Sequence, residues 1–199
     1  MEKQEIISHL KADARVVQVN VCDPNTNLVW GEGNLNSRII LVGEAPGGQE
    51  DRLKRPFVGP AGKLLSEELE TAGIPREFVY ITNVVKCRPV TLQNGRPNNR
   101  TPNAREIKAW SEILMREIQT IAPDVILCLG AIAASALIHP GFAMNAERGK
   151  WFDSPDGTQI MATFHPSYLL RTQSYGDDTP LQLFRSDLSQ AIELMKNAS

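Results

Sequence analysis

Short apolar runs alternate along the chain with longer segments in which apolar residues recur every three or four positions. The runs predict buried strands, because a few consecutive apolar residues bounded by turns suit a strand that is covered on both faces. They occupy residues 38–42, 79–82, 125–129 and 159–164. Three of the longer segments predict helices whose apolar stripes face a core. The stripes are Ala61, Leu64, Leu65, Leu69 and Ala72; Ile107, Trp110, Leu114, Ile118 and Ile121; and Leu181, Phe184, Leu188, Ile192 and Met195.

The alternation of strands and helices predicts a mainly parallel sheet with helices on both faces. We therefore expect an α/β fold, a three-layer α/β/α sandwich around a mainly parallel four-stranded sheet. The length of 199 residues suits a single domain over residues 1–199. A further helix is expected near residues 2–11.

Ligands of such sheets bind just beyond the carboxyl ends of the strands. In this sequence those ends carry Gly43-Glu44, Asn83, Gly130-Ala131 and His165. Three of the four ends therefore offer a polar side chain that suits a binding site.

Two of these strand ends carry side chains, Glu44 and Asn83, that suit catalysis or the recognition of a base. Residues 43–51 read G-E-A-P-G-G-Q-E-D, a glycine- and proline-rich turn that exposes its backbone. Glu44 stands at its mouth, where a carboxylate can orient water or face a developing cation; a helix N-cap or a plain turn residue is the alternative. Asn83 offers one acceptor and two donors, enough to read the edge of a base, but asparagine is also a common turn residue.

An aromatic side chain and a histidine complete the candidate set. Phe57, in the loop 56–62, could stack on a flat ligand or belong to the core. His165 follows a strand and precedes a proline, which keeps it off any helix and directs it toward the cleft. The rival motif, His139-Pro140, follows a helical stretch and is better explained as a helix end, and His9 is expected at the surface.

The charge distribution is more informative than the net charge of −2. Residues 52–108 hold 11 Lys and Arg against 5 Glu and no Asp, a local charge of +6. Local charge governs phosphate binding better than the total does. A solvated basic loop on an unrelated enzyme would look the same.

The rest of the composition excludes several protein classes. The sequence contains no apolar run of about 18 residues, so it predicts no transmembrane span. The first residues lack the layout of a secretion signal. Cys22, Cys87 and Cys128 are widely spaced and odd in number. That pattern argues against a disulfide framework and fits a reducing cytoplasm.

Together, the loops resemble those of the uracil-DNA glycosylase superfamily, specifically its family 4. The motifs are G-E-A-P-G-x-x-E-D from residue 43, F-V-G-x-A-G from residue 57, T-N-V-V-K-C-R-P from residue 82 and H-P-S from residue 165. This combination in this order is highly specific, and the resemblance runs from about residue 29 to residue 171. It implies one α/β/α domain that flips uracil out of DNA and hydrolyses its N-glycosidic bond, which starts base excision repair.

The resemblance also implies roles for single residues. Glu44 and His165 are the expected catalytic residues, Glu44 in the loop that activates water and His165 at O2 of the leaving uracil. Phe57 is expected to stack on the base and Asn83 to read its edge. The residues expected to bind the base are Gly43, Ala45, Phe57 and Asn83.

For the DNA itself, the resemblance implies a wedge that fills the vacated base stack, either Leu169 or Leu170. The other expected DNA contacts are Lys86, Arg88, Arg96, Arg100, Ser167 and Arg171.

The chain departs from family 4 at the iron–sulfur cluster. Family members typically hold a four-iron–four-sulfur cluster on four cysteines: an N-terminal C-x-x-C, one cysteine after the T-N-V-V-K run and one in the next helix. Cys87 matches the third, but the other positions fall near Val16 and Val19 and on Trp110. One ligand of four cannot hold such a cluster. We therefore expect no iron–sulfur cluster and no metal, and an apolar patch in its place.

A second departure is the loop of residues 90–100, which is longer than in ordinary family 4 members. A relative that links covalently to uracil-DNA has a nucleophilic histidine in a long loop at this place. This loop contains no histidine, so covalent trapping by that route is not expected. Its basic and glycine residues still suit phosphate contact.

Three functions remain open: a uracil-DNA glycosylase, a glycosylase for another deaminated base such as hypoxanthine or xanthine, and a non-catalytic module that binds uracil-DNA. Glu44, Asn83 and His165 together favour the first, whereas the fold alone would not separate them. We expect a cytoplasmic monomer that binds uracil-containing DNA and has no membrane partner. Downstream repair enzymes remain open as further partners.

Overall fold

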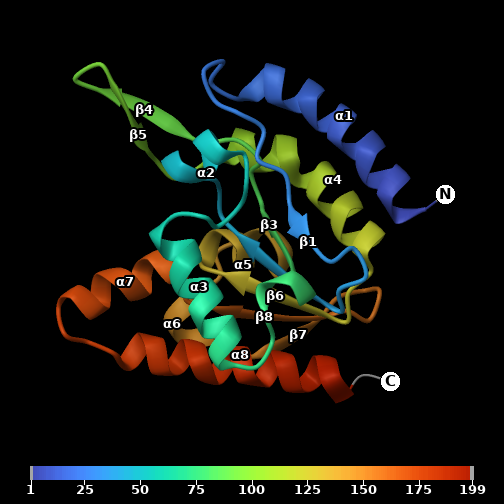
Figure 1. The fold of residues 1–199 in the computed structure, drawn as a ribbon, viewed down its shortest axis with the longest axis vertical. Coiled ribbons are helices and arrows are strands. Elements are labelled where there is room, and N and C mark those ends of the chain that lie inside the picture. Colours follow the sequence, from blue (N-terminus) through green and yellow to red (C-terminus); the bar gives the residue numbers. More distant parts are fainter. Residues whose placement is uncertain (1, 198–199) are drawn as a thin grey trace.

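The protein is described by a computed structural model over residues 2–197. A six-stranded sheet of order β1-β3-β2-β6-β8-β7 forms its centre (Figure 1). Neighbouring strands pair in parallel from β3 to β8, while β1 and β7 pair antiparallel at the two edges. The strands are β1 (Glu32–Gly33), β2 (Ile39–Gly43), β3 (Tyr80–Asn83), β6 (Val125–Leu129), β7 (Trp151–Asp153) and β8 (Gln159–Thr163).

The four predicted strands are the parallel centre of this sheet. The α/β prediction is confirmed, but its count of four strands omits the edges, so the sheet is wider than expected. β1 and β7 have two and three residues. Strands of that length are too short to show a hydrophobic alternation, so their positions could not be read from the sequence.

Helices cover both faces of the sheet. They are α1 (Lys3–Val21), α2 (Gly48–Leu53), α3 (Pro60–Thr71), α4 (Ala104–Ile121), α5 (Ala131–Leu137), α6 (Met144–Glu147), α7 (Pro166–Ser174) and α8 (Thr179–Asn197), with a 3-10 turn η1 (Arg76–Phe78). The expected N-terminal helix extends well beyond residue 11. No helix in residues 2–197 is long and apolar enough to cross a membrane.

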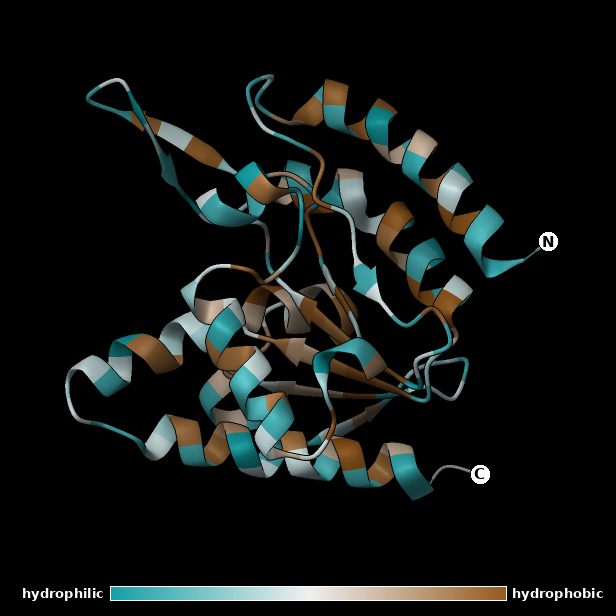
Figure 2. Ribbon diagram, in the orientation of Figure 1, coloured by the Kyte–Doolittle hydropathy of each residue, from teal (hydrophilic) through white to brown (hydrophobic). Residues whose placement is uncertain are grey.

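The side chains of β2 divide the core into two layers. Ile40 and Val42 pack in one cluster with apolar residues of α1, α4 and α5. Ile39 and Leu41 point to the other face and pack with α3, α7 and α8. Because successive strand residues face opposite ways, both sets must be apolar. Figure 2 shows the result, with brown helix faces turned toward the sheet and teal faces outward.

Local signals fix the helix that follows the long loop. α4 begins with a capping box, in which the Asn103 side chain accepts from the Glu106 N–H and the Glu106 carboxylate accepts from the Asn103 N–H. The helix ends at Ala122, which adopts the left-handed conformation with φ 52°. These caps satisfy backbone groups that the helix itself leaves open.

The expected basic loop is a regular hairpin. β4 (Val90–Gln93) and β5 (Arg96–Asn99) pair antiparallel as a separate two-stranded sheet. Asn94 and Gly95 join them with φ of 51° and 73°, the conformation of a two-residue type I′ turn, for which Asn-Gly is the preferred sequence. The hairpin projects from the body of the molecule (Figure 1).

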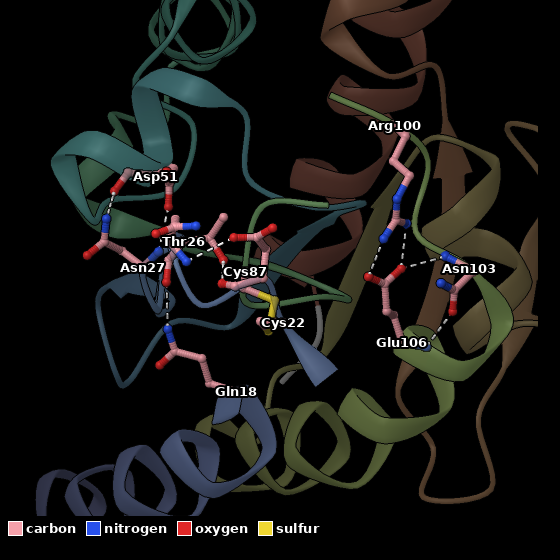
Figure 3. Close-up of a disulfide and its surroundings, with 11 residues drawn as sticks. Gln18, Cys22, Thr26, Asn27, Asp51, Cys87, Arg100, Asn103 and Glu106 are labelled. Carbon is pink, nitrogen blue, oxygen red and sulfur yellow. Dashed lines mark hydrogen bonds and ion pairs between the residues drawn. A yellow bond between two sulfur atoms is a disulfide. The ribbon is translucent and has the colours of Figure 1, made fainter. Parts of the chain in front are cut away.

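A disulfide joins Cys22, at the end of α1, to Cys87, four residues after β3 (Figure 3). The cysteine pattern, which argues against a disulfide framework, did not predict this single pair. The two residues are 65 positions apart in sequence, and only the packing of α1 against α4 and the sheet brings them together. Cys128 is free and buried in β6.

A buried ion pair, Lys86–Glu117, connects α4 to the end of β3. Neither side chain has exposed surface. The Lys86 ammonium donates to Glu117, to the Thr82 hydroxyl (2.6 Å) and to the Asn83 carbonyl (2.7 Å), and the Tyr80 hydroxyl donates to Glu117 (2.8 Å). Burial lowers the pKa of Lys86, and Glu117 opposes that effect.

We expect Lys86→Met to lower the free energy of unfolding by about 3–5 kcal/mol, because it leaves a buried carboxylate without its cation. Lys86→Met/Glu117→Gln should recover part of the loss, since a neutral amide can still accept from the Tyr80 hydroxyl. Denaturant unfolding of the single and double variants measures this. Losses that simply add would show that the two groups act independently.

Candidate active site

A cavity of about 790 Å³ lies at the carboxyl ends of β2, β3, β6 and β8. This is the edge that the sequence predicted. Residues from six separate segments line it, and most predicted site residues meet there. Those are Glu44, Ala45, Phe57, Asn83, Arg100, His165, Ser167, Leu170 and Arg171.

The loop after β2 carries Glu44 into the cavity. Its backbone is tied to the next strand end, because the Gly43 and Glu44 carbonyls accept from the N–H groups of Val84 (2.9 Å) and Val85 (3.1 Å). The Glu44 side chain is half-buried. Burial raises the pKa of its carboxyl above the ordinary 4.5, so its charge is poorly compensated until a cation comes near.

Phe57 forms one wall. Its backbone has φ 51°, a left-handed conformation that is unfavourable for a bulky residue. Arg76 stabilises it by donating to the carbonyls of Phe57 (2.9 Å) and Pro56 (2.6 Å). A Cβ on Gly62 would stand 2.0 Å from the Phe57 carbonyl. The first turn of α3 can therefore lie this close to Phe57 only with glycine at position 62. The constraint aims the ring across the cavity.

Asn83 forms the floor. Its side chain is 2% exposed, and its Oδ1 finds no donor among the described residues. A Cβ on Gly43 would stand 2.5 Å from both Asn83 Oδ1 and the Phe57 ring edge. Gly43 therefore keeps open the space beside the amide. A buried acceptor without a donor is costly, and this one faces the space where a ligand would lie.

His165 stands opposite Phe57, with ring centroids 5.8 Å apart. Its Nδ1 accepts from the Ser167 N–H (3.1 Å) and lies 2.8 Å from the Ser167 hydroxyl. Since Nδ1 is an acceptor, the neutral ring carries its proton on Nε2. Burial, with Arg171 adding to it, lowers the pKa of His165 to about 4. At neutral pH the residue is thus an uncharged Nε2–H donor.

Helix α7 carries the two residues expected as the wedge, and one of them lines the cavity. Leu170 is half-buried and lines the cavity with Ser167 and Arg171, and the Arg171 guanidinium lies 5.9 Å from the Tyr168 ring. Leu169 is a correction: it is fully buried in the core between α7, α3 and α8. Neighbouring positions on a helix point in different directions, so only Leu170 can reach DNA.

The expected basic DNA contacts divide into three groups. Lys86 is a correction, because it is fully buried and its donors are occupied by protein groups. Arg88 and Arg100 brace the hairpin: Arg88 donates to Asn99 Oδ1 (2.6 Å) and Arg100 forms two 2.7 Å bonds to Glu106 (Figure 3 shows the second pair). Arg96, at the hairpin tip, is exposed.

Sequence reasoning missed several residues that shape the site. Glu50 accepts from the N–H groups of Val58 (3.0 Å) and Gly59 (2.6 Å), which ties the Glu44 loop to the Phe57 loop. Asp51 accepts from the Asn27 N–H at 2.6 Å (Figure 3). Both belong to the E-D end of the first motif, where their presence was visible but their partners were not. The rival histidine, His139, pairs with Glu147 outside the cavity.

The residues at the family's cluster position do not fit a four-iron–four-sulfur cluster. The sequence has three cysteines, of which two form the disulfide and one lies in the core. Among residues 2–197, no group of three or more His, Cys, Asp or Glu could hold a metal ion. The expected apolar patch is wrong for the valines, since Val16 is 64% and Val19 84% exposed, while Trp110 is buried.

Comparisons with known proteins agree with this geometry. The chain is 47% identical over 177 residues to a type-4 uracil-DNA glycosylase of Thermotoga maritima, covering 87% of this chain and 86% of that protein. A type-4 uracil-DNA glycosylase of Archaeoglobus fulgidus is 38% identical over 174 residues, covering 84% and 80%. Residues 30–189 match the uracil DNA glycosylase superfamily. The chain belongs to that superfamily.

Proposed function

We propose that this protein is a uracil-DNA glycosylase that flips uracil out of DNA and hydrolyses its N-glycosidic bond, the first step of base excision repair. The observation that carries the proposal is the buried Asn83 Oδ1, which has no donor within residues 2–197. The N3–H of uracil would supply that donor, while the amide nitrogen of Asn83 would meet O4. Cytosine presents the opposite pattern at both atoms. The type-4 names of the similar proteins support the same substrate.

The remaining groups suit the chemistry of glycosidic cleavage. The bond breaks through an oxocarbenium-like sugar and an anionic base. The neutral Nε2–H of His165 can donate to O2, where negative charge develops, without bringing a charge of its own. Glu44 can orient the attacking water and offset the positive charge on the sugar. Phe57 offers a flat face for the base, and Leu170 can fill the gap left in the stack.

The proposed enzyme works without an iron–sulfur cluster. The Cys22–Cys87 disulfide joins the same two regions, the N-terminal helix end and the segment after β3, in which the family has cluster cysteines. We infer that this covalent link performs the tethering for which relatives use the cluster. No step of the chemistry above needs iron.

Purified protein should accordingly contain no stoichiometric iron, because three cysteines cannot supply four thiolate ligands. Metal analysis and the visible spectrum measure this directly. Iron at a stoichiometry near four per chain would contradict the proposal on the cofactor and leave the proposed reaction to be tested separately.

Wild-type protein should excise uracil from labelled oligonucleotides, and alkaline strand scission then reveals the abasic site. Glu44→Gln and His165→Ala should each lower the rate by about 10²–10³, the usual effect of removing one charge-stabilising group. Parallel substrates with thymine, hypoxanthine or xanthine test the competing deaminated bases. A wild-type protein that cuts none of them would sink the proposed function.

The pH profile should follow Glu44 on its acid side. The carboxylate is the active form and its pKa is raised above 4.5, so kcat/KM should fall as pH drops through a value above 4.5. His165 should remain neutral until about pH 4. The residual activity of Glu44→Gln should therefore stay level down to about that pH. An acid limb that persists unchanged in Glu44→Gln would assign it to another group.

Asn83→Asp should reduce the preference for uracil over cytosine. A carboxylate has no donor for O4, and in its protonated form it could pair with cytosine. Leaving buried polar groups unmatched costs about 1–3 kcal/mol each, so the ratio of U to C excision should drop at least tenfold. Asn83→Ala serves as the control that removes both functions of the amide. An unchanged ratio in Asn83→Asp would exclude Asn83 from base reading.

A further inference from the structure

The β4-β5 hairpin stands at the rim of the cavity but contributes little to the core. Residues 91–99 are all exposed. At its base, however, Pro89, Asn99, Arg100 and Thr101 line the cavity. The amide nitrogen of Asn99 lies 3.5 Å from where a Cβ would stand on Gly47, in the loop that carries Glu44. The hairpin is therefore an arm that starts at the active site and extends away from it.

Two arginines make the base of this arm rigid. Arg88 donates to Asn99 Oδ1 (2.6 Å) and to the Pro97 carbonyl (3.2 Å), and its guanidinium lies 3.3 Å from where a Cβ would stand on Gly48. Arg100 donates to the Val90 carbonyl (3.2 Å) and pairs with Glu106 at the start of α4. Each strand of the arm is thus fixed to a different part of the body.

The register of the hairpin separates its two faces. Val90 pairs with Asn99 and Leu92 with Pro97, so these four residues share one face, while Thr91, Gln93, Arg96 and Asn98 share the other. The face that contains Asn99 is continuous with the cavity. On that face Leu92 lies opposite Pro97, and part of the hairpin ribbon in Figure 2 is brown.

Leu92 has no structural role that would explain it. Its side chain is 72% exposed and lies outside both core clusters. Threonine or glutamine would suit an exposed strand equally well and without the apolar surface. The arm carries one cation, Arg96, and no acidic residue between positions 90 and 99. An apolar side chain on one face and a cation on the other face of the same arm, with no anion, suit a segment that meets nucleic acid.

The length of the arm indicates which part of DNA it meets. Four residues of antiparallel strand extend about 13 Å, and the minor and major grooves are about 6 and 12 Å wide. When the uracil strand lies across the cavity mouth, an arm of this length reaches over a groove to the complementary strand. Leu170 on α7 also lines the cavity.

We propose that the hairpin of residues 90–99 is a duplex-specific arm, which contacts the strand opposite the uracil. Leu92 packs against the bases exposed when uracil leaves the stack, and Arg96 contacts a phosphate of that strand. This inference rests on the proposed uracil-DNA glycosylase function. Its consequence is a preference for double-stranded over single-stranded substrate that the cavity by itself does not provide.

The test compares Leu92→Thr with the wild type on the same uracil oligonucleotide, as a single strand and paired with its complement. Threonine keeps the strand preference and removes the apolar surface. Burying a leucine side chain is worth about tenfold in binding, so the ratio of kcat/KM on duplex to that on single strand should fall by roughly tenfold. Fluorescence anisotropy on both oligonucleotides gives the corresponding ratio of affinities without requiring excision.

Phe78→Ala is the matched control. Phe78 is 57% exposed, but it precedes β3 at the edge of the sheet away from the cavity, so both ratios should stay at their wild-type values. If Leu92→Thr keeps the wild-type ratios, or loses equally on both substrates, the proposal that the hairpin contacts the opposite strand is refuted. A wild type that excises no uracil refutes the proposed function instead. The ratio of affinities for duplex and single strand, measured by anisotropy, still tests the proposed role of the hairpin.

Discussion

The carboxyl edge of β3 depends on the buried Lys86–Glu117 pair. An ammonium has three N–H donors, and here they go to Glu117, to the Thr82 hydroxyl and to the Asn83 carbonyl. Glu117 belongs to α4, so one helix on the surface of the sheet fixes the backbone of Asn83, which lines the cavity. A buried charge tolerates few alternative arrangements, because any position without its partners is strongly unfavourable. The geometry of the floor is thereby specified more sharply than apolar packing alone would allow.

In the Lys86–Glu117 network the ammonium donors have acceptors, whereas selected polar groups of the cavity have no partner among residues 2–197. Among residues 2–197 the Asn83 oxygen has no donor, the His165 ring is neutral with its pKa lowered to about 4, and burial raises the pKa of the half-buried Glu44 carboxyl. Uracil is uncharged before cleavage, and charge appears only as the bond breaks. In the proposed reaction, a neutral donor at the base and a carboxylate near the sugar would therefore interact more strongly with the transition state than with the ground state. The strained Phe57 backbone fits the same arrangement, since strain persists only where the surroundings enforce it.

Local patterns in the sequence predicted the parts that local chemistry decides. The four central strands, the three amphipathic helices and the polar strand ends at Glu44, Asn83 and His165 follow from period and topology. The sequence did not predict which residues of distant segments pair with each other. Nothing near Lys86 in sequence reveals Glu117, 31 positions later, and Cys22 lies 65 positions from Cys87. Leu169 and Leu170 were indistinguishable until the helix direction separated the buried Leu169 from the half-buried Leu170 that lines the cavity.

Because pairs between distant residues could not be predicted, the local charge of the sequence overstated the basic surface. Residues 52–108 count +6 in sequence, but several of these cations have carboxylate partners elsewhere: Lys86 with Glu117, Arg100 with Glu106, and Arg55 and Arg76 with Glu32. A paired cation contributes little to the release of counterions, because its field is already compensated. Exposed cations, such as Arg96 on the hairpin and Arg171 on α7, are then the ones left to contact phosphates. Arg171 lines the cavity, and the base of the hairpin that carries Arg96 lines it too, so under the proposed function both cations would be available to the phosphates of DNA bound at the cavity.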